Sequence, residues 1–156
     1  MGLWNFFFSL KVNAVTKFFC AIFSLLMLLA SGATHAHEYS GHNFVMFHPF
    51  AYPSQNGQDL VPVYLRFISL TGPDKLIGAE CRYADSVELR ANQDLNAAAI
   101  PFIQIDEGIS FDIDNPATPH ILLKGIQLPF GFMRQYDMKL IFEKSGPIDV
   151  TVSVGM

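Results

Sequence analysis

Histidines gather near the start of the chain, where their side chains could bind a metal ion. Four of the five histidines lie close together in this region: His35, His37, His42 and His48. Imidazole binds copper, zinc and nickel, and a nearby thioether such as that of Met46 favours Cu(I). If export removes the residues up to Ala36, the new α-amino group and imidazole of His37 could chelate one ion, with His42, Met46 or His48 as further ligands. The alternative is a frayed N-terminus on which these histidines are solvated polar side chains.

The remaining histidine, His120, is too isolated in the sequence to indicate an enzyme. A serine hydrolase needs a convergent Ser, His and acid, and the chain has no Gly-x-Ser-x-Gly turn. Phosphate-binding glycine loops, Cys-x-x-Cys pairs and His-Glu-x-x-His sites are also absent from the sequence. A nucleophilic pair of Cys81 and His120 stays open as a minor hypothesis. We therefore predict a protein that is not an enzyme.

Residues 1–36 have the pattern of a secretory signal peptide. Lys11 and Lys17 precede an apolar run over residues 18–30, and small residues offer cleavage points after Ala33 or Ala36. A retained membrane anchor is the alternative, but the run is shorter than the roughly 20 residues that span a bilayer. We expect cleavage, a mature domain of residues 37–156, a periplasmic location and no stable membrane insertion.

The charge of this mature domain limits its partners, and its cysteine content limits its disulfides. It keeps all 14 acidic residues and loses Lys11 and Lys17 from the 10 basic ones, which leaves a formal charge of −6. Such an acidic surface argues against nucleic acid and against anionic lipid. Cys20 belongs to the export segment, so Cys81 is the single mature thiol and no intramolecular disulfide can form. We expect the Cys81 side chain to be buried.

Apolar residues alternate with polar ones along most of the mature domain, which is typical of half-buried strands. The clearest case is a hairpin in which residues 138–143 and 148–154 flank the turn residues 144–147. Further strands are predicted at 44–48, 61–69, 75–82, 86–90, 100–106, 109–113 and 119–124. Many short strands separated by Gly, Pro, Asn and Asp indicate an all-β fold, either a sandwich or a Greek-key barrel.

Several segments match one known family in order and spacing. They are Phe-His-Pro-Phe-Ala at 47–51, Val-Tyr-Leu at 63–65, Asp-Lys-Leu-Ile-Gly-Ala at 74–79, the strand at 84–89 ending in Val-Glu-Leu, and the closing stretch at 125–146 with Phe-Glu-Lys-Ser-Gly. From His37 to Val154 the chain thus resembles the periplasmic copper chaperones called PCu(A)C. The resemblance implies a cupredoxin-like Greek-key β-sandwich, copper as cargo and a partner in a copper-requiring oxidase assembly pathway.

The copper motif of that family is mostly missing. The resemblance implies a His directly after Val-Glu-Leu, a Met some ten residues later and a final His-x-Met. Arg90 stands at the first position, no Met occurs between Met46 and Met133, and Leu122 replaces the last Met, so only His120 is kept. A guanidinium repels a cation, whereas Leu keeps the volume of Met. Besides the minor Cys81–His120 hypothesis, two functions remain: a copper-chaperone-like protein that handles copper through the N-terminal histidines, or a non-metal binding or assembly module on the same sandwich.

One apolar segment has two interpretations. Phe130, Phe132 and Met133 surround Gly131 in a predicted loop, where they would form either an exposed contact patch or a plug for the end of the sandwich.

Overall fold

A computed structural model describes residues 38–107, 111 and 113–155, and in this part of the chain all the regular structure is β. The strands are β1 (Glu38–Ser40), β2 (Phe44–Phe47), β3 (Phe50–Ala51), β4 (Leu60–Tyr64), β5 (Phe67–Leu70), β6 (Asp74–Glu80), β7 (Ala84–Arg90), β8 (Ala99–Ile100), β9 (Ile103–Ile105), β10 (His120–Ile126), β11 (Gln135–Phe142) and β12 (Gly146–Val154). The predicted all-β class is confirmed.

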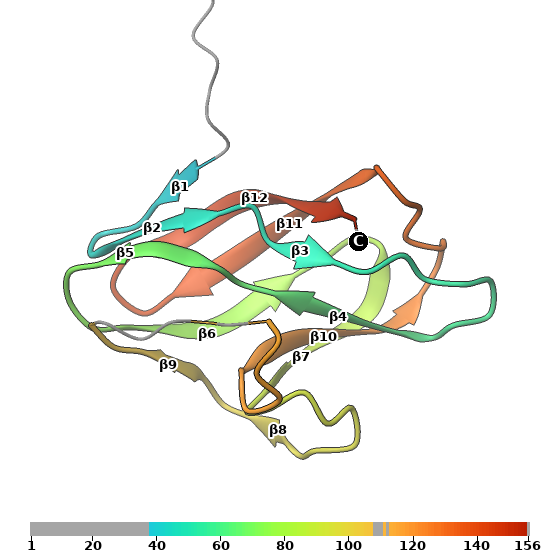
Figure 1. Cartoon of the computed structure of the whole chain (residues 1–156), viewed down its shortest axis with the longest axis horizontal. Coiled ribbons are helices and arrows are strands. Elements are labelled where there is room, and N and C mark those ends of the chain that lie inside the picture. The colour runs from blue at the N-terminus through green and yellow to red at the C-terminus, as the bar shows by residue number, and fades with distance from the viewer. Residues whose placement is uncertain (1–37, 108–110, 112, 156) are drawn as a thin grey trace, which may run out of the picture. The chain divides into compact units, whose positions relative to one another are not determined.

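The strands form one large sheet and one small one (Figure 1). The large sheet has the order β8-β7-β10-β4-β3-β12-β11-β6-β9, and the small sheet has the order β1-β2-β5. Sequence neighbours such as β6 and β7 lie far apart in the large sheet's order and yet contact each other. The large sheet therefore curls over on itself, which makes a sandwich with a single core between its two halves.

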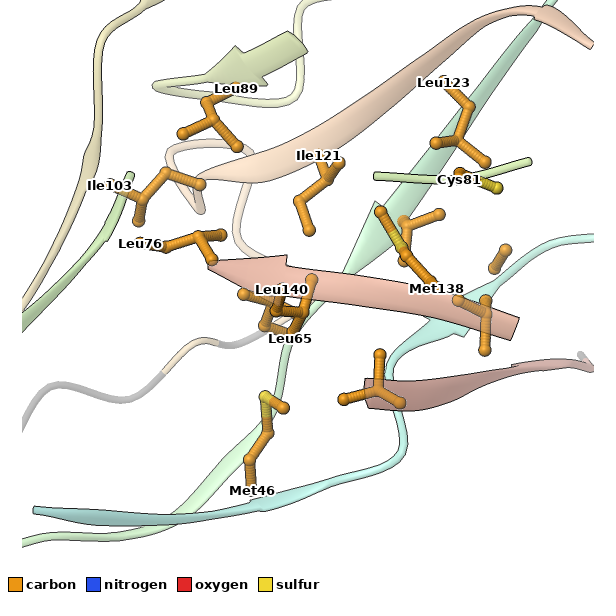
Figure 2. Close-up of a cluster of buried hydrophobic side chains, with 14 of the residues drawn as sticks. Met46, Leu65, Leu76, Cys81, Leu89, Ile103, Ile121, Leu123, Met138 and Leu140 are labelled. Atoms are coloured by element: carbon orange, nitrogen blue, oxygen red, sulfur yellow. The ribbon is translucent and has the colours of Figure 1, made fainter. Parts of the chain in front are cut away.

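Apolar side chains from both halves fill this core, as Figure 2 shows for Leu89, Ile121 and Leu123 on one side and Met138 and Leu140 on the other. The β11–β12 hairpin follows the predicted alternation, because the inward-pointing residues of both strands are buried. The predicted hairpin is thus confirmed. Gly146 begins β12 with φ of 73°, a conformation that a residue with a Cβ rarely adopts.

Some predicted strands are interrupted or missing. The expected strand at 61–69 is split between β4 and β5, because the chain leaves the large sheet after Tyr64 and joins the small one at Phe67. The expected strand at 100–106 is broken around Pro101, whose ring removes a donor from the ladder. Phe111 and Ile113 lie outside strands, so the prediction for 109–113 is wrong at these two residues. The short strands β1 and β3 were not predicted.

The loop with three large apolar residues combines both predicted roles. Phe130 is fully buried and its ring stacks on Tyr136 with centroids 4.0 Å apart, so Phe130 plugs the end of the sandwich. Phe132 and Met133 are 54% and 82% exposed.

The predicted signal peptide of residues 1–36 and His37 lie outside the described residues. Within the part of the chain that is described, no helix has the length and hydropathy needed to cross a bilayer.

Candidate functional site

The pairing of β7 with β10 brings the predicted site residues together. In this antiparallel ladder Arg90 lies opposite His120, Glu88 opposite Leu122 and Ser86 opposite Lys124. Directly opposed residues carry their side chains on the same face, with Cβ atoms roughly 5 Å apart. The positions that the resemblance assigns to copper binding are therefore neighbours in space.

These side chains lie on the face of β10 that points away from the main core. Ile121 and Leu123 belong to the core cluster, so their neighbours His120 and Leu122 point the other way. Around His120 this second face is closed to solvent, because His120 and Leu122 are fully buried and Arg90 is 7% exposed. Farther along the same face, the side chains of Glu88 and Lys124 are 28% and 39% exposed. The ring of Tyr64 on β4 covers His120 at a centroid distance of 5.7 Å.

Two cations share one carboxylate next to His120. Arg90 Nη2 donates to Glu88 Oε2 at 2.5 Å, and Lys124 Nζ donates to Glu88 Oε1 at 3.0 Å. The hydrogen bond from Lys124 lowers the pKa of Glu88, burial opposes this effect, and the charge of Arg90 adds to the lowering. Glu88 is therefore a carboxylate held by both cations. We call Glu88, Arg90 and Lys124 the ion cluster.

The imidazole of His120 is buried without a hydrogen bond at either Nδ1 or Nε2, and Arg90 Nε beside it also has no partner among the described residues. Burial lowers the pKa of His120 and the charge of Arg90 lowers it further, whereas the backbone of Asn92 acts in the opposite direction. The Asn92 backbone is thus close to the ring but not aligned for a hydrogen bond. His120 is a neutral ring packed against a charged guanidinium.

Among the described residues, no second soft ligand approaches this position. Met46 and Cys81 both belong to the core cluster (Figure 2). His120 lies on the other face of β10, because its neighbour Ile121 points into that core. Burial raises the pKa of the Cys81 thiol, which keeps it protonated and unreactive. The described residues contain no group of three or more His, Cys, Asp or Glu that could hold a metal ion. The residues around His120 therefore do not fit Cu(I), and Cys81 and His120 do not form a nucleophilic pair.

The N-terminal histidines are spread along the β1–β2 hairpin. His42 is exposed in its turn and its backbone N–H donates to Ser145 Oγ at 2.7 Å. His48 follows the far end of β2, where its Nδ1 lies 3.2 Å from Tyr39 Oη and 3.0 Å from the Thr151 carbonyl oxygen. An extended strand rises about 3.3 Å per residue, so β2 alone separates these histidines by more than 10 Å. Met46 points into the core between them. The structure does not bring these three together.

Comparison with known proteins places the fold. No protein-family model matches the sequence, and no curated protein matches it. Among solved structures, the apo PCuAC domain of PmoF2 is 23% identical with a TM-score of 0.60, and the match covers 76% of this chain and 94% of that domain. The copper-bound PCuAC domain from PmoF2 is also 23% identical, with a TM-score of 0.56 over 76% of this chain and 97% of that one.

A third match is the solution structure of CuI-DR1885 from Deinococcus radiodurans, with 17% identity and a TM-score of 0.53 over 81% of this chain and 85% of that one. The chain has the PCuAC fold. The resemblance read from the sequence motifs is thus confirmed at the level of the fold, at identities that also fit a divergent sequence. The copper bound in two of these solved structures is a property of those proteins.

Sequence reasoning identified positions 90, 120 and 122 but missed the residues that now surround them. Glu88 and Arg90 are two apart in a predicted strand, which places both side chains on one face and was the available signal. Lys124 and Tyr64 come from other strands, and only the pairing of β10 with β7 and β4 reveals them.

Proposed function

We propose that the protein is an exported, non-enzymatic, copper-chaperone-like binding module that has lost Cu(I) transfer at the inherited position. The observation that carries this proposal is the buried guanidinium of Arg90 directly opposite His120. A permanent positive charge on a buried side chain repels a cation, because the repulsion between like charges is only weakly screened in a medium of low dielectric constant. The module then acts by binding another molecule.

The ion cluster supports this reading because it leaves no free donor for a metal. Glu88 is the one carboxylate near His120 in the ladder, and both of its oxygens are engaged by Arg90 and Lys124. Leu122 fills the place of the missing thioether without providing a ligand. A single imidazole binds Cu(I) too weakly to compete with the chelating sites of other proteins.

Copper handling elsewhere on the chain remains a second candidate. His42 is an exposed imidazole close to the start of the proposed mature chain. Together with His37 at a new N-terminus it could bind Cu(II), with His48 or Met46 recruited only if the β1–β2 hairpin rearranged. The family resemblance further suggests a partner in a copper-requiring oxidase assembly pathway, reached after export to the periplasm.

Metal analysis of the mature protein tests the proposal. We expect protein purified from the periplasm to contain much less than one copper per chain, and Cu(I) competition with bathocuproine disulfonate to be unchanged by His120→Ala. Stoichiometric copper that is lost in His120→Ala would contradict the proposal. Loss of Cu(II) binding on removing residues 37–42 would instead support the N-terminal candidate. Mass spectrometry of the same sample gives the cleavage point, expected after Ala33 or Ala36.

A further inference from the structure

A groove of 840 Å³ lies apart from the ion cluster, between the end of β4, the small sheet and the connection from β9 to β10. Its walls are mostly aromatic, and the residues that line it are Phe47, His48, Phe50, Tyr52, Tyr64, Leu65, Arg66, Phe67, Phe111, Ile113, Asp114 and Ser153. The volume lies within the roughly 300–1,000 Å³ of ordinary small-ligand sites, which are also lined by apolar and aromatic side chains with a few polar groups.

One wall is a row of rings from β3 and β4. Tyr52 packs edge-on against Phe50 at a centroid distance of 5.0 Å and against Tyr64 at 6.2 Å. Tyr52 is still 46% exposed despite these contacts, and Phe47 farther along the groove is 39% exposed. Rings that keep this much exposure leave apolar area that a planar ligand can cover.

A single guanidinium supplies the positive charge of the groove. Arg66, at the break between β4 and β5, lies over the ring of Phe47 with its Cζ 5.1 Å from the centroid. Arg66 is exposed, and among the described residues it forms no ion pair with a carboxylate. Its counterpart Arg82 also lies over a ring, that of Tyr83, but is paired with Asp137 at 2.9 Å. Arg66 is thus positioned and available to bind an anion.

We propose that this groove binds a small organic carboxylate with an aromatic body, whose ring packs against Tyr52 and Phe47 and whose carboxylate is bound by Arg66. A planar guanidinium matches a carboxylate through two parallel hydrogen bonds. Asp114 is the other charged group lining the groove, and because its negative charge repels a carboxylate, Arg66 is the lining residue that binds the anion. The inference goes beyond the proposed function and does not depend on positions 90, 120 and 122.

Titration calorimetry with 3-phenylpropionate, and with 3-phenylpropanol as its uncharged analogue, tests the site on the mature protein. We expect saturable one-to-one binding of the acid and at least fivefold weaker binding of the alcohol. Arg66→Gln should weaken binding of the acid five- to tenfold and leave the alcohol unchanged. Tyr52→Ser removes an exposed ring, and we expect it to weaken both ligands.

Arg82→Gln is the matched control, because it removes another arginine that lies over an aromatic ring but lines a different groove. We expect it to leave the affinity for 3-phenylpropionate unchanged. Equal weakening by Arg66→Gln and Arg82→Gln would mean unspecific charge attraction and would overturn the proposal. Equal affinity for acid and alcohol, or no saturable binding of the acid, would overturn it as well. The proposal would also be overturned if a peptide ending in phenylalanine bound at least tenfold more tightly than the free acid, because the ligand would then be a polypeptide.

Discussion

Two buried polar residues of the same sandwich differ in how well their hydrogen-bonding groups are satisfied. Asp74, at the start of β6, is 1% exposed and His120, at the start of β10, is fully buried. The Asp74 carboxylate accepts hydrogen bonds from the backbone N–H groups of Lys75, Lys144 and Ser145 and from Ser145 Oγ, at 2.7 to 3.1 Å. His120 accepts or donates none in the described part of the chain.

This difference separates a polar residue that the fold needs from one that the fold tolerates. Asp74 ties the β11–β12 turn to β6 and so joins strands that are distant in sequence. The His120 ring loses its hydrogen bonds to water on burial and gains in return only the contact with the Asn92 backbone, which is not aligned for a hydrogen bond. The sandwich is therefore stabilised by its apolar core and by Asp74, and not by His120.

The largest effect should come from removing the Asp74 carboxylate. We expect Asp74→Ala to lower the free energy of unfolding by about 3 kcal/mol, because buried backbone donors of the turn lose a charged acceptor. Urea denaturation of the mature domain measures this change. Asp74→Asn, which keeps one acceptor oxygen, should lose less. A loss below about 1 kcal/mol for Asp74→Ala would mean that contacts other than the Asp74 hydrogen bonds stabilise the turn.

The opposite sign is expected at His120. His120→Leu replaces a buried, unpaired polar ring by an apolar side chain, so we expect unchanged stability or a gain of about 1 kcal/mol. His120→Ala serves as the comparison, since it leaves a cavity and should be destabilising. The same denaturation experiment measures both. If His120→Leu proved as harmful as Asp74→Ala, the two residues would be alike and the comparison above would fail.

A smaller effect should appear in the pH dependence. The pKa of His120 is lowered in the folded protein, so folding favours the neutral ring. Its contribution is fully present above the unfolded-state pKa of about 6.5 and decreases as the pH falls below that value. We expect the melting temperature to drop more between pH 7.5 and 5.5 in the wild type than in His120→Leu. His42 and His48 are present in both proteins, so any difference comes from His120. If the melting temperatures of the two proteins fell in parallel with pH, His120 would not be the group responsible.

Asp74 titrates in a different window. Burial would raise the pKa of its carboxyl, but the hydrogen bonds from Ser145 and from the backbone of Lys144, Lys75 and Ser145 outweigh burial and lower it. Its contribution is therefore present above about pH 3.8 and is lost as the pH falls through the lower folded-state value. The His120 contribution begins to fall below about pH 6.5 and the Asp74 contribution below about pH 3.8, so the onset of each can be followed in the same acid titration.

The sequence was a good guide to strands and a poor guide to polar contacts. Alternation at 138–143 and 148–154 predicted the β11–β12 hairpin because each strand has one buried face. The split at Leu65 and Arg66 was not predictable, since it depends on which sheet each half joins. For the site, motif spacing located Arg90, His120 and Leu122, but the partners Lys124 and Tyr64 required the strand order. The role of Asp74 as the acceptor for a turn 70 residues away likewise depended on tertiary structure.

The central claim is that the ion cluster occupies the position that the resemblance assigns to copper, and rebuilding the ligands tests it most directly. Arg90→His combined with Leu122→Met places two imidazoles opposite each other on β7 and β10, with a thioether two residues along the same face. Leu122→Met alone, which keeps Arg90, is the control. We expect Cu(I) competition to show at least tenfold tighter binding for the double variant than for the wild type or the control. A wild type that binds one Cu(I) as tightly as the double variant, through His120, would contradict the account.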